Sequence, residues 1–236
     1  MKLHRPLTLS IDIGGTGIKM MIVDAKDKPQ TTYFRMLTPH PATHSAVLAL
    51  LKKMIAKEKL SFDRISAGFP GVVINGVVKT APNLHPTWRN KNFQKDLEKM
   101  TGKPARVAND ADVQGYGDSS GKGLEMMITL GTGVGSALFM NAQLVPNLEL
   151  GHHPFLNNLS YEELLGEAAF KKHGVRRWNK LLKQAIALWA KTFNYQKLYL
   201  GGGYAQCISF RLPANVKITS NVEGVLGGIK LWENHA

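Results

Sequence analysis

The sequence predicts an α/β protein of two lobes, a small N-terminal one and a larger C-terminal one, with a cleft between them. Two segments predict this fold class, because each has an apolar strand, a glycine-rich turn and a second apolar strand: residues 9–23 and residues 126–140. The repeated pattern indicates a duplicated α/β architecture. No linker rich in proline, glycine or serine separates the halves. We therefore expect the boundary inside continuous structure, with lobes at 1–108 and 109–236.

The first half predicts several strands and one helix. Strands are expected at 7–13, 18–24, 33–37 and 64–71. Residues 45–59 carry apolar side chains at helical spacing, with Ser45 as the expected N-cap. The Asn75-Gly76 pair predicts a hairpin within 72–80.

The second half predicts a strand running into a helix over 105–112 and a strand ending in glycines over 197–203. Residues 161–174 are expected to be helical, and Gly174 is the expected start of a further helix. Residues 222–233 predict a terminal helix that packs back on the first lobe.

Composition excludes several classes of protein. The 236 residues are 44% hydrophobic, enough for one large core or two modest ones. No stretch approaches the ~20 apolar residues of a membrane span, and the first residues lack the apolar core of a signal peptide. Cys207 is the only cysteine, which excludes a disulfide framework and a thiolate metal site. These features predict a soluble cytoplasmic protein with no membrane partner.

The charge balance is unusual. Thirty Lys and Arg residues against 17 Asp and Glu residues give a net charge of +13. Such a field favours a polyanionic partner: nucleic acid, anionic lipid or a chain of phosphates. A basic surface that serves only solubility is the alternative, and charge alone does not choose between them.

The first glycine turn has the composition of a phosphate site. Glycine has no Cβ to block a ligand, so backbone N–H groups and the Thr16 hydroxyl can point at one anion. The turn contains Gly14 and Gly15, and Lys19 adds a positive charge just beyond it. Asp12, at the end of the preceding strand, is a candidate to hold Mg²⁺ through water.

Two later turns repeat this chemistry, one with Gly131, Thr132 and Gly133, and one around Gly202. A single glycine turn is most often only a tight hairpin, whereas three at strand ends favour a track for phosphates. Neither G-x-x-x-x-G-K-[ST] nor the dinucleotide fingerprint is present. The interpretation that remains is that the protein is a two-lobed phosphotransferase of the actin and sugar-kinase type.

Asn109 and Asp110 lie where a strand gives way to a helix. Asp110 is a candidate general base, because a carboxylate there can accept a hydroxyl proton while the oxygen attacks phosphorus. The alternative is that either residue only caps the helix. Asp112 is expected to point away from Asp110 and is not paired with it.

Further candidates lie in the second half. Glu149 and His152 can hydrogen-bond adjacent sugar hydroxyls, with a zinc site as the weaker alternative. Glu167 lies on a predicted helix, where an ordinary solvent-facing glutamate is the alternative.

Residues 171–183 contain six Lys or Arg and no acidic residue. At 100° per residue, one helix face carries basic side chains and the opposite face carries Trp178 and Leu182. The basic face is a candidate track for a phosphate polymer, and an ordinary amphipathic helix is the alternative. Its members are Lys172, Arg176, Lys180 and Lys183.

Taken in order, the motifs resemble those of the ROK family of sugar kinases and repressors. They are D-x-G-G-T-G-x-K, G-F-P-G, A-P-N-L…W, N-D-A-D, L-G-T-G-x-G-S-A, E-L-G-H and G-G-G, and they span residues 10–203. Within the family, the sequence is most similar to the polyphosphate glucokinases. The combination is highly specific, although each motif alone is not.

The resemblance implies a role for each matching residue. Asp110 would be the base that activates the sugar 6-hydroxyl, with Asn109 beside it as a sugar ligand. The remaining sugar ligands would be Glu149, His152 and Glu167, with Gly71 and Asn83 in loops near the sugar. The phosphate loops would be formed by Gly14, Gly15, Thr16, Lys19, Gly131, Thr132, Gly133 and Gly202.

Departures from the family pattern refine these expectations. Many members carry a cysteine-rich zinc motif after E-x-G-H, and its absence here favours the polyphosphate branch without structural zinc. Tyr204 stands where an aliphatic residue is expected. The first strand begins by residue 7, which leaves no room for the DNA-reading domain of the repressors and argues against nucleic acid as a partner.

The resulting hypothesis is transfer of a phosphoryl group from inorganic polyphosphate to the 6-hydroxyl of glucose, with mannose as a second sugar and Mg²⁺ as cofactor. An ATP-dependent sugar kinase is the nearest alternative, and a non-catalytic sugar sensor is an alternative of another class. The resemblance also implies a homodimer.

Overall fold

The structure is a computed structural model that describes residues 6–26, 28–58, 61–219 and 227–233. The chain divides into two compact units, the first formed by residues 1–117 and 222–236 and the second by residues 118–221. The sequence predicts a boundary near residue 108, but the division falls after Gly117, and the first unit is the longer one. The reason is that the helix that begins at Asp110 packs on the sheet of the first unit. A Cβ added to Gly68 of that sheet would lie 3.3 Å from the Cα atom of Asp110.

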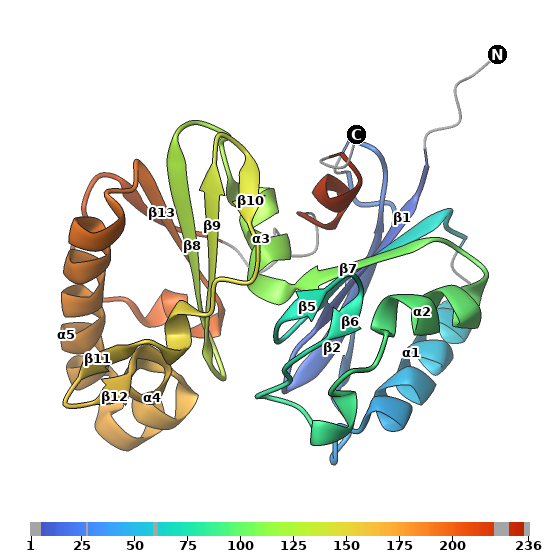
Figure 1. The fold of residues 1–236 in the computed structure, drawn as a ribbon, viewed down its shortest axis with the longest axis horizontal. Coiled ribbons are helices and arrows are strands. Elements are labelled where there is room, and N and C mark those ends of the chain that lie inside the picture. The colour runs from blue at the N-terminus through green and yellow to red at the C-terminus, as the bar shows by residue number, and fades with distance from the viewer. Residues whose placement is uncertain (1–5, 27, 59–60, 220–226, 234–236) are drawn as a thin grey trace. The chain divides into compact units, whose positions relative to one another are not determined.

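The first unit is built on a five-stranded sheet of order β3-β2-β1-β4-β7 (Figure 1). Its strands are β1 (Thr8–Ile13), β2 (Gly17–Val23), β3 (Phe34–Leu37), β4 (Arg64–Phe69) and β7 (Ala105–Asn109). The β1 strand is antiparallel to β2 and parallel to β4. A hairpin of β5 (Val73–Ile74) and β6 (Val77–Val78) turns at Asn75 and Gly76, which both have positive φ, as the sequence predicts.

Two helices cover one face of this sheet, α1 (His44–Glu58) and α2 (Phe93–Thr101). Alternate β1 residues such as Leu9 and Ile11 face them and pack with Leu51 of α1 in the core. The prediction of Ser45 as N-cap is wrong. Ala46 N–H donates to the Thr43 hydroxyl oxygen at 3.2 Å, so Thr43 precedes the helix and caps it. A short 3-10 helix, η1 (Pro86–Trp88), precedes α2.

The other face of the sheet is covered by α3 (Asp110–Asp118) and by the 3-10 helix η4 (Gly227–Trp232). Ser66 of β4 donates to the carbonyl oxygen of Gly228 at 2.6 Å and accepts from the Trp232 indole at 2.9 Å. The guanidinium groups of Arg64 and Arg106 lie 4.9 and 4.5 Å from the Trp232 ring. The predicted terminal helix thus returns to the first unit as η4, while residues 222–226 lie outside the described part.

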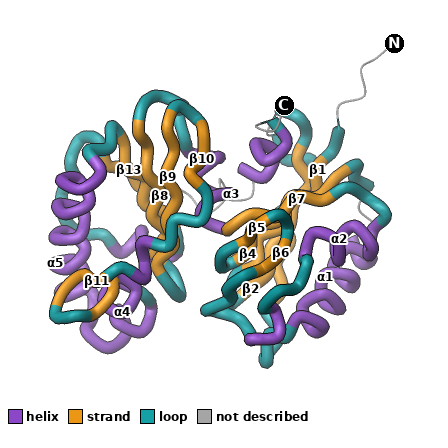
Figure 2. The backbone as a smooth tube through the Cα atoms, viewed as in Figure 1, coloured by secondary structure: helices purple, strands orange, loops and turns teal. Residues whose placement is uncertain are grey.

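The second unit contains a five-stranded sheet of order β10-β9-β8-β13-β14 (Figure 2). Its strands are β8 (Leu124–Leu130), β9 (Val134–Met140), β10 (Gln143–Val145), β13 (Lys197–Gly201) and β14 (Val216–Ile218). As in the first unit, the central strand is antiparallel to its hairpin partner and parallel to the next strand, β13. The common strand order confirms the predicted duplicated α/β architecture.

The helices of the second unit are α4 (Tyr161–Leu165) and the long α5 (Glu167–Phe193). The predicted helix over 161–174 is interrupted, because Gly166 is extended between α4 and α5. Gly174 has a non-helical backbone, with φ 73° and ψ 166°, and α5 consists of two helices that meet at this kink, so a further helix begins at Gly174 as the sequence predicts. The smaller elements are β11 (Pro154–Leu156), β12 (Leu159–Ser160), η2 (Leu150–His152) and η3 (Gly203–Cys207).

In the described part of the chain, no helix combines the length and the apolar character that a membrane crossing requires.

Candidate functional site

The first glycine turn joins β1 to β2. Gly14 N–H donates to the Gly17 carbonyl oxygen at 3.0 Å, and the Thr38 hydroxyl donates to the Gly14 carbonyl oxygen at 2.6 Å. Thr16, at the tip, is exposed. The turn is therefore held at its base, while the threonine predicted to meet a phosphate lies at the surface.

Asp12 and Lys19 face each other across β1 and β2. The Lys19 ammonium lies 2.8 Å from Asp12 Oδ2, and both side chains are about one quarter exposed, at 25% and 23%. Burial by itself would lower the pKa of Lys19, but the Asp12 carboxylate and the neighbouring Tyr33 outweigh it, and the pKa lies above its ordinary value. Lys19 is therefore cationic at neutral pH, and the negative charge of Asp12 neutralises part of its positive charge.

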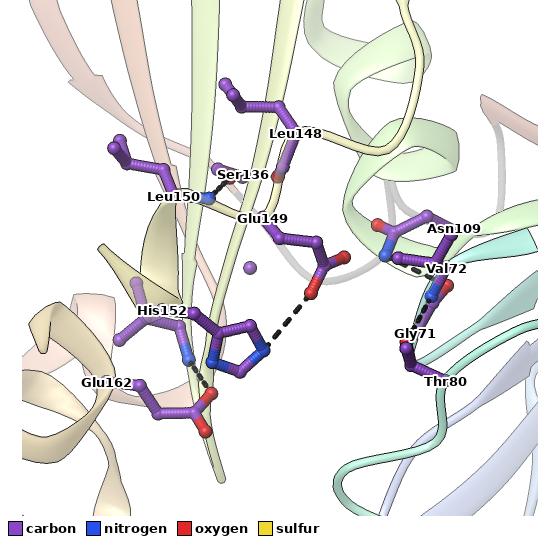
Figure 3. A network of polar contacts seen from close by, with 12 residues as sticks. Gly71, Val72, Thr80, Asn109, Ser136, Leu148, Glu149, Leu150, His152 and Glu162 are labelled. Atoms are coloured by element: carbon purple, nitrogen blue, oxygen red, sulfur yellow. Dashed lines mark hydrogen bonds and ion pairs between the residues drawn. The ribbon is translucent and has the colours of Figure 1, made fainter.

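Asn109 ends β7 and caps α3, and Figure 3 shows its amide beside Gly71. Its side-chain oxygen accepts from Ala111 N–H at 2.8 Å and from Asp112 N–H at 3.3 Å, and its amide donates to the Gly71 carbonyl oxygen at 3.2 Å. Asp110, the first residue of α3, is half-buried and also accepts from Ala111 N–H at 2.8 Å. The capping alternative therefore holds for Asn109.

Gly71 is required by close packing. A Cβ at this position would lie 2.2 Å from the Thr80 carbonyl oxygen, and Val72 N–H donates to the Thr80 hydroxyl at 2.9 Å. This packing holds the Gly71 carbonyl group beside Asn109. Asn83 lies half-buried in a separate turn, which Leu84 N–H closes on the Ala81 carbonyl oxygen at 3.1 Å.

In the second unit, Glu149 and His152 form an ion pair around η2. Glu149 Oε2 lies 3.3 Å from His152 Nε2. Burial raises the pKa of the Glu149 carboxyl above its ordinary value; His152 lowers it in part, and nearby Glu162 raises it again. The structure thus brings these two predicted residues together, with Glu149 half-buried and His152 exposed, as a pair that can donate and accept hydrogen bonds.

Sequence reasoning missed one residue that fixes this loop, Ser136, and one that fixes the start of β9, Glu162. Ser136 of β9 accepts from Leu150 N–H at 3.0 Å and donates to the Leu148 carbonyl oxygen. Glu162 of α4 accepts from Val134 N–H at 3.0 Å. Ser136 belongs to the G-S-A segment of the second glycine motif. A serine within an otherwise apolar strand could have indicated a hydrogen-bonding role. No local pattern pointed to Glu162.

The second glycine turn joins β8 to β9 and contacts the start of α5. Glu167 N–H donates to the carbonyl oxygens of Gly131 at 3.0 Å and Thr132 at 3.3 Å. Gly202 has φ +85°, and a Cβ there would lie 2.3 Å from the Leu130 carbonyl oxygen. The structure therefore brings together Gly131, Thr132, Gly202 and Glu167, four of the predicted site residues of this unit.

The basic face of α5 agrees with the predicted amphipathic pattern, with one change. Arg176, Lys180 and Lys183 are exposed, while Trp178 and Leu182 are buried. The break at Gly174 separates Lys172 from them, so the four residues do not share one continuous helical face.

The acidic and histidine residues of the described segments form no cluster of three or more that could cage a metal ion. Mg²⁺ does not need such a cage, because it commonly binds through one or two carboxylates, its own waters and substrate phosphates. Asp12 fits that donor set: it is a single, partly exposed carboxylate at a glycine turn.

The duplicated sheets, with glycine turns at corresponding hairpins, define the two-lobed actin-like fold of sugar kinases. Residues 8–158 match the model of the ROK family, and the chain belongs to that family.

Its relatives include polyphosphate-dependent enzymes. The chain is 31% identical to a polyphosphate glucokinase of Mycobacterium tuberculosis, over 92% of this chain and 88% of the relative. The polyphosphate/ATP-glucomannokinase of Arthrobacter sp. strain KM superposes with a TM-score of 0.89 at 30% identity, covering 98% of this chain and all of that one. A ROK glucokinase from Streptomyces griseus, solved with glucose and AMPPNP, shares the fold with a TM-score of 0.80 at 20% identity, over 95% and 98% of the two chains.

The packing of Gly202 predicts a sharp difference between two neighbouring glycines. Gly202→Ala should lower the free energy of unfolding by about 1–3 kcal/mol, because the new methyl group meets the Leu130 carbonyl and φ is positive. Gly203→Ala is the control, since no described heavy atom lies within 4 Å of its added Cβ. Urea unfolding of both variants measures the difference, and equal losses would contradict the packing described.

Proposed function

We propose that this protein transfers a phosphoryl group from inorganic polyphosphate to the 6-hydroxyl of glucose, and that mannose is a second acceptor. The observation that carries the proposal is the similarity, over nearly the whole chain, to a polyphosphate glucokinase and a polyphosphate/ATP-glucomannokinase. Two of the family motifs, the glycine turns after β1 and after β8, lie at corresponding hairpins of the two sheets, which supports a phosphotransferase more than a sugar-binding module.

On the acceptor side, Asp110 is the proposed general base. Because Asn109 caps α3 with its own side chain, the helix keeps a cap while Asp110 accepts the proton of the sugar hydroxyl. Asn109, Glu149 and His152 are the proposed hydrogen-bonding partners of the sugar. Gly71 and Asn83 would shape the loops near it.

On the donor side, the glycine turns would bind phosphate oxygens through backbone N–H groups and the hydroxyls of Thr16 and Thr132. Lys19 would add a positive charge, Gly133 would allow close approach of the phosphate chain, and Gly202, packed on Leu130, would hold the third turn in place. Asp12 would hold Mg²⁺ through water, and the ion would supply neutralisation of phosphate charge. These groups stabilise the charge of the transferred phosphoryl group, which is the main task of a phosphotransferase.

ATP is the second candidate donor, because the Arthrobacter relative is named for both polyphosphate and ATP. We expect glucose 6-phosphate to form with Mg²⁺ and nucleotide-free polyphosphate. Separate reactions with polyphosphate and with ATP, read by a coupled dehydrogenase, measure the donor. Product from ATP alone would refute the proposed donor and keep the sugar-kinase class, whereas folded protein that binds glucose but is inert with both donors would indicate a sugar sensor.

Asp110→Asn should reduce kcat by about 10²–10⁴-fold, because the amide cannot accept the hydroxyl proton. The amide oxygen can still accept from Ala111 N–H, so the fold should be retained. Asp96→Asn is the matched control, since this carboxylate lies on α2 and pairs with His44. Near-normal turnover of folded Asp110→Asn protein would rule out the base role.

The basic face of α5 is the proposed path of the polyphosphate chain beyond the turns. Its exposed Arg176, Lys180 and Lys183 have no acidic neighbour between residues 171 and 193 of the helix. Serial contacts of this kind bind a polyanion with strong dependence on salt. Lys172 precedes the break in the helix and is the outlying member of the proposed path.

Reversal of charge at Arg176 and Lys180 to Glu should raise the KM for polyphosphate at least about tenfold and leave the KM for glucose unchanged. The control is Lys52→Glu with Lys53→Glu, an equal change of net charge on exposed residues of α1. Steady-state kinetics at two salt concentrations makes the comparison. Equal effects of both double variants would mean that net charge, and not the α5 face, attracts the donor.

A further inference from the structure

The start of α5 connects two glycine turns of the second unit. The backbone N–H of Glu167 donates to the carbonyl oxygens of Gly131 and Thr132 in the second turn. Its side-chain oxygen Oε1 accepts from the Tyr204 hydroxyl at 3.2 Å. Tyr204 follows directly after the third glycine turn. One residue therefore holds the second turn through its backbone and the third through its carboxylate.

The same carboxylate oxygen holds a lysine. Lys171, one helical turn further along α5, has its ammonium 2.6 Å from Glu167 Oε1, although its side chain is 69% exposed. The hydrogen bond to Glu167 raises the pKa of Lys171. A lysine ammonium has three N–H donors, of which Glu167 uses one. Lys171 is thus a charged group fixed near both turns with donors left for an anion.

Both turns leave space for a ligand beside their backbone. A Cβ added to Gly131 or to Gly203 would have no described heavy atom within 4 Å, in contrast to the tightly packed Gly202. The Tyr204 ring packs on Phe170 with centroids 4.4 Å apart, which fixes the position of its hydroxyl. The structure therefore supplies an ammonium and a phenol at two turns that have open backbone.

We propose that Lys171 and Tyr204 bind the phosphates of the donor, and that Glu167 is the positioning residue that holds both at the glycine turns. The inference rests on the proposed function, because the turns receive phosphate only in a phosphotransferase. It assigns Glu167 to the donor, in contrast to the sugar-binding role that the family resemblance implies. The reason is that its carboxylate already binds a cation and a phenol beside the phosphate turns.

Kinetics with each substrate varied in turn tests the two ligands. Lys171→Met should raise the KM for polyphosphate about tenfold, the loss expected for a hydrogen bond to a charged group. Tyr204→Phe keeps the ring on Phe170 and should raise it about threefold. The KM for glucose should not change in either variant. Lys191→Met is the control, because it removes an exposed charge in the last turn of the same helix.

Glu167→Gln separates the donor role from the sugar role. The amide keeps the size of the side chain but loses the charge that holds Lys171, so the KM for polyphosphate should rise while the KM for glucose stays constant. A rise in the KM for glucose alone would make Glu167 a sugar ligand and overturn the inference. Lys171→Arg should recover most of the affinity lost in Lys171→Met, and thermal unfolding of each variant checks its fold.

Assays of the wild-type protein with each donor distinguish failure of this inference from failure of the proposed function. If wild-type protein uses ATP and not polyphosphate, the proposed donor fails, and the same variants are measured with ATP. Unchanged KM values for the donor that the wild type uses would overturn the inference and leave phosphoryl transfer standing. A wild-type protein that is folded but inert with both donors would overturn both.

Discussion

The turn between β8 and β9 organises the second unit, because three other segments pack directly against its backbone. Gly202 approaches the Leu130 carbonyl, Gly166 approaches the Thr132 carbonyl, and Gly151 approaches the Val134 carbonyl, with an added Cβ at 2.3, 3.1 and 2.1 Å. At 2.3 and 2.1 Å an added methyl group would overlap the backbone carbonyl, so Gly202 and Gly151 require glycine, whereas Gly166 approaches Thr132 less tightly. The loop with Glu149 and His152, the start of α5 and the third glycine turn thereby meet at one strand end.

In the first unit, side-chain hydrogen bonds hold the segments at a strand end together. One amide, that of Asn109, caps α3 and holds the Gly71 loop, so the strand end, the helix and the loop are fixed together. Across the hairpin, Asp12 and Lys19 compensate each other beside the first turn. On the same sheet, η4 covers Ser66. Two residues of η4, Gly228 and Trp232, supply the hydrogen-bond partners that this buried hydroxyl needs. The Asn109 amide and the Ser66 hydroxyl thus have partners, while Thr16 at the tip of the first turn stays exposed.

The excess of positive charge is concentrated on one helix of the second unit. Much of it lies on α5, whose opposite face is anchored by Trp178 and Trp189 in the core of the second unit. A helix fixed in this way presents its lysines and arginines on a rigid support, which favours contact with an extended anion over a compact one. Glu167 and Lys171 mark the point where this helix meets the glycine turns. The start of this helix therefore contacts the proposed donor site through Glu167 and through Phe170, which packs on Tyr204.

The sequence by itself determined the central strands, helix α1, the duplicated strand–turn–strand pattern and the family, because apolar periodicity and turn chemistry are local properties, but it did not predict α2. It located the Asn75-Gly76 hairpin and the buried face of α5 for the same reason. Only the tertiary structure decided that Thr43 and not Ser45 caps α1, and what Glu167 contacts. A polar side chain can cap, pair or bind a ligand with equal local cost, and distant segments of the chain determine which partner it meets.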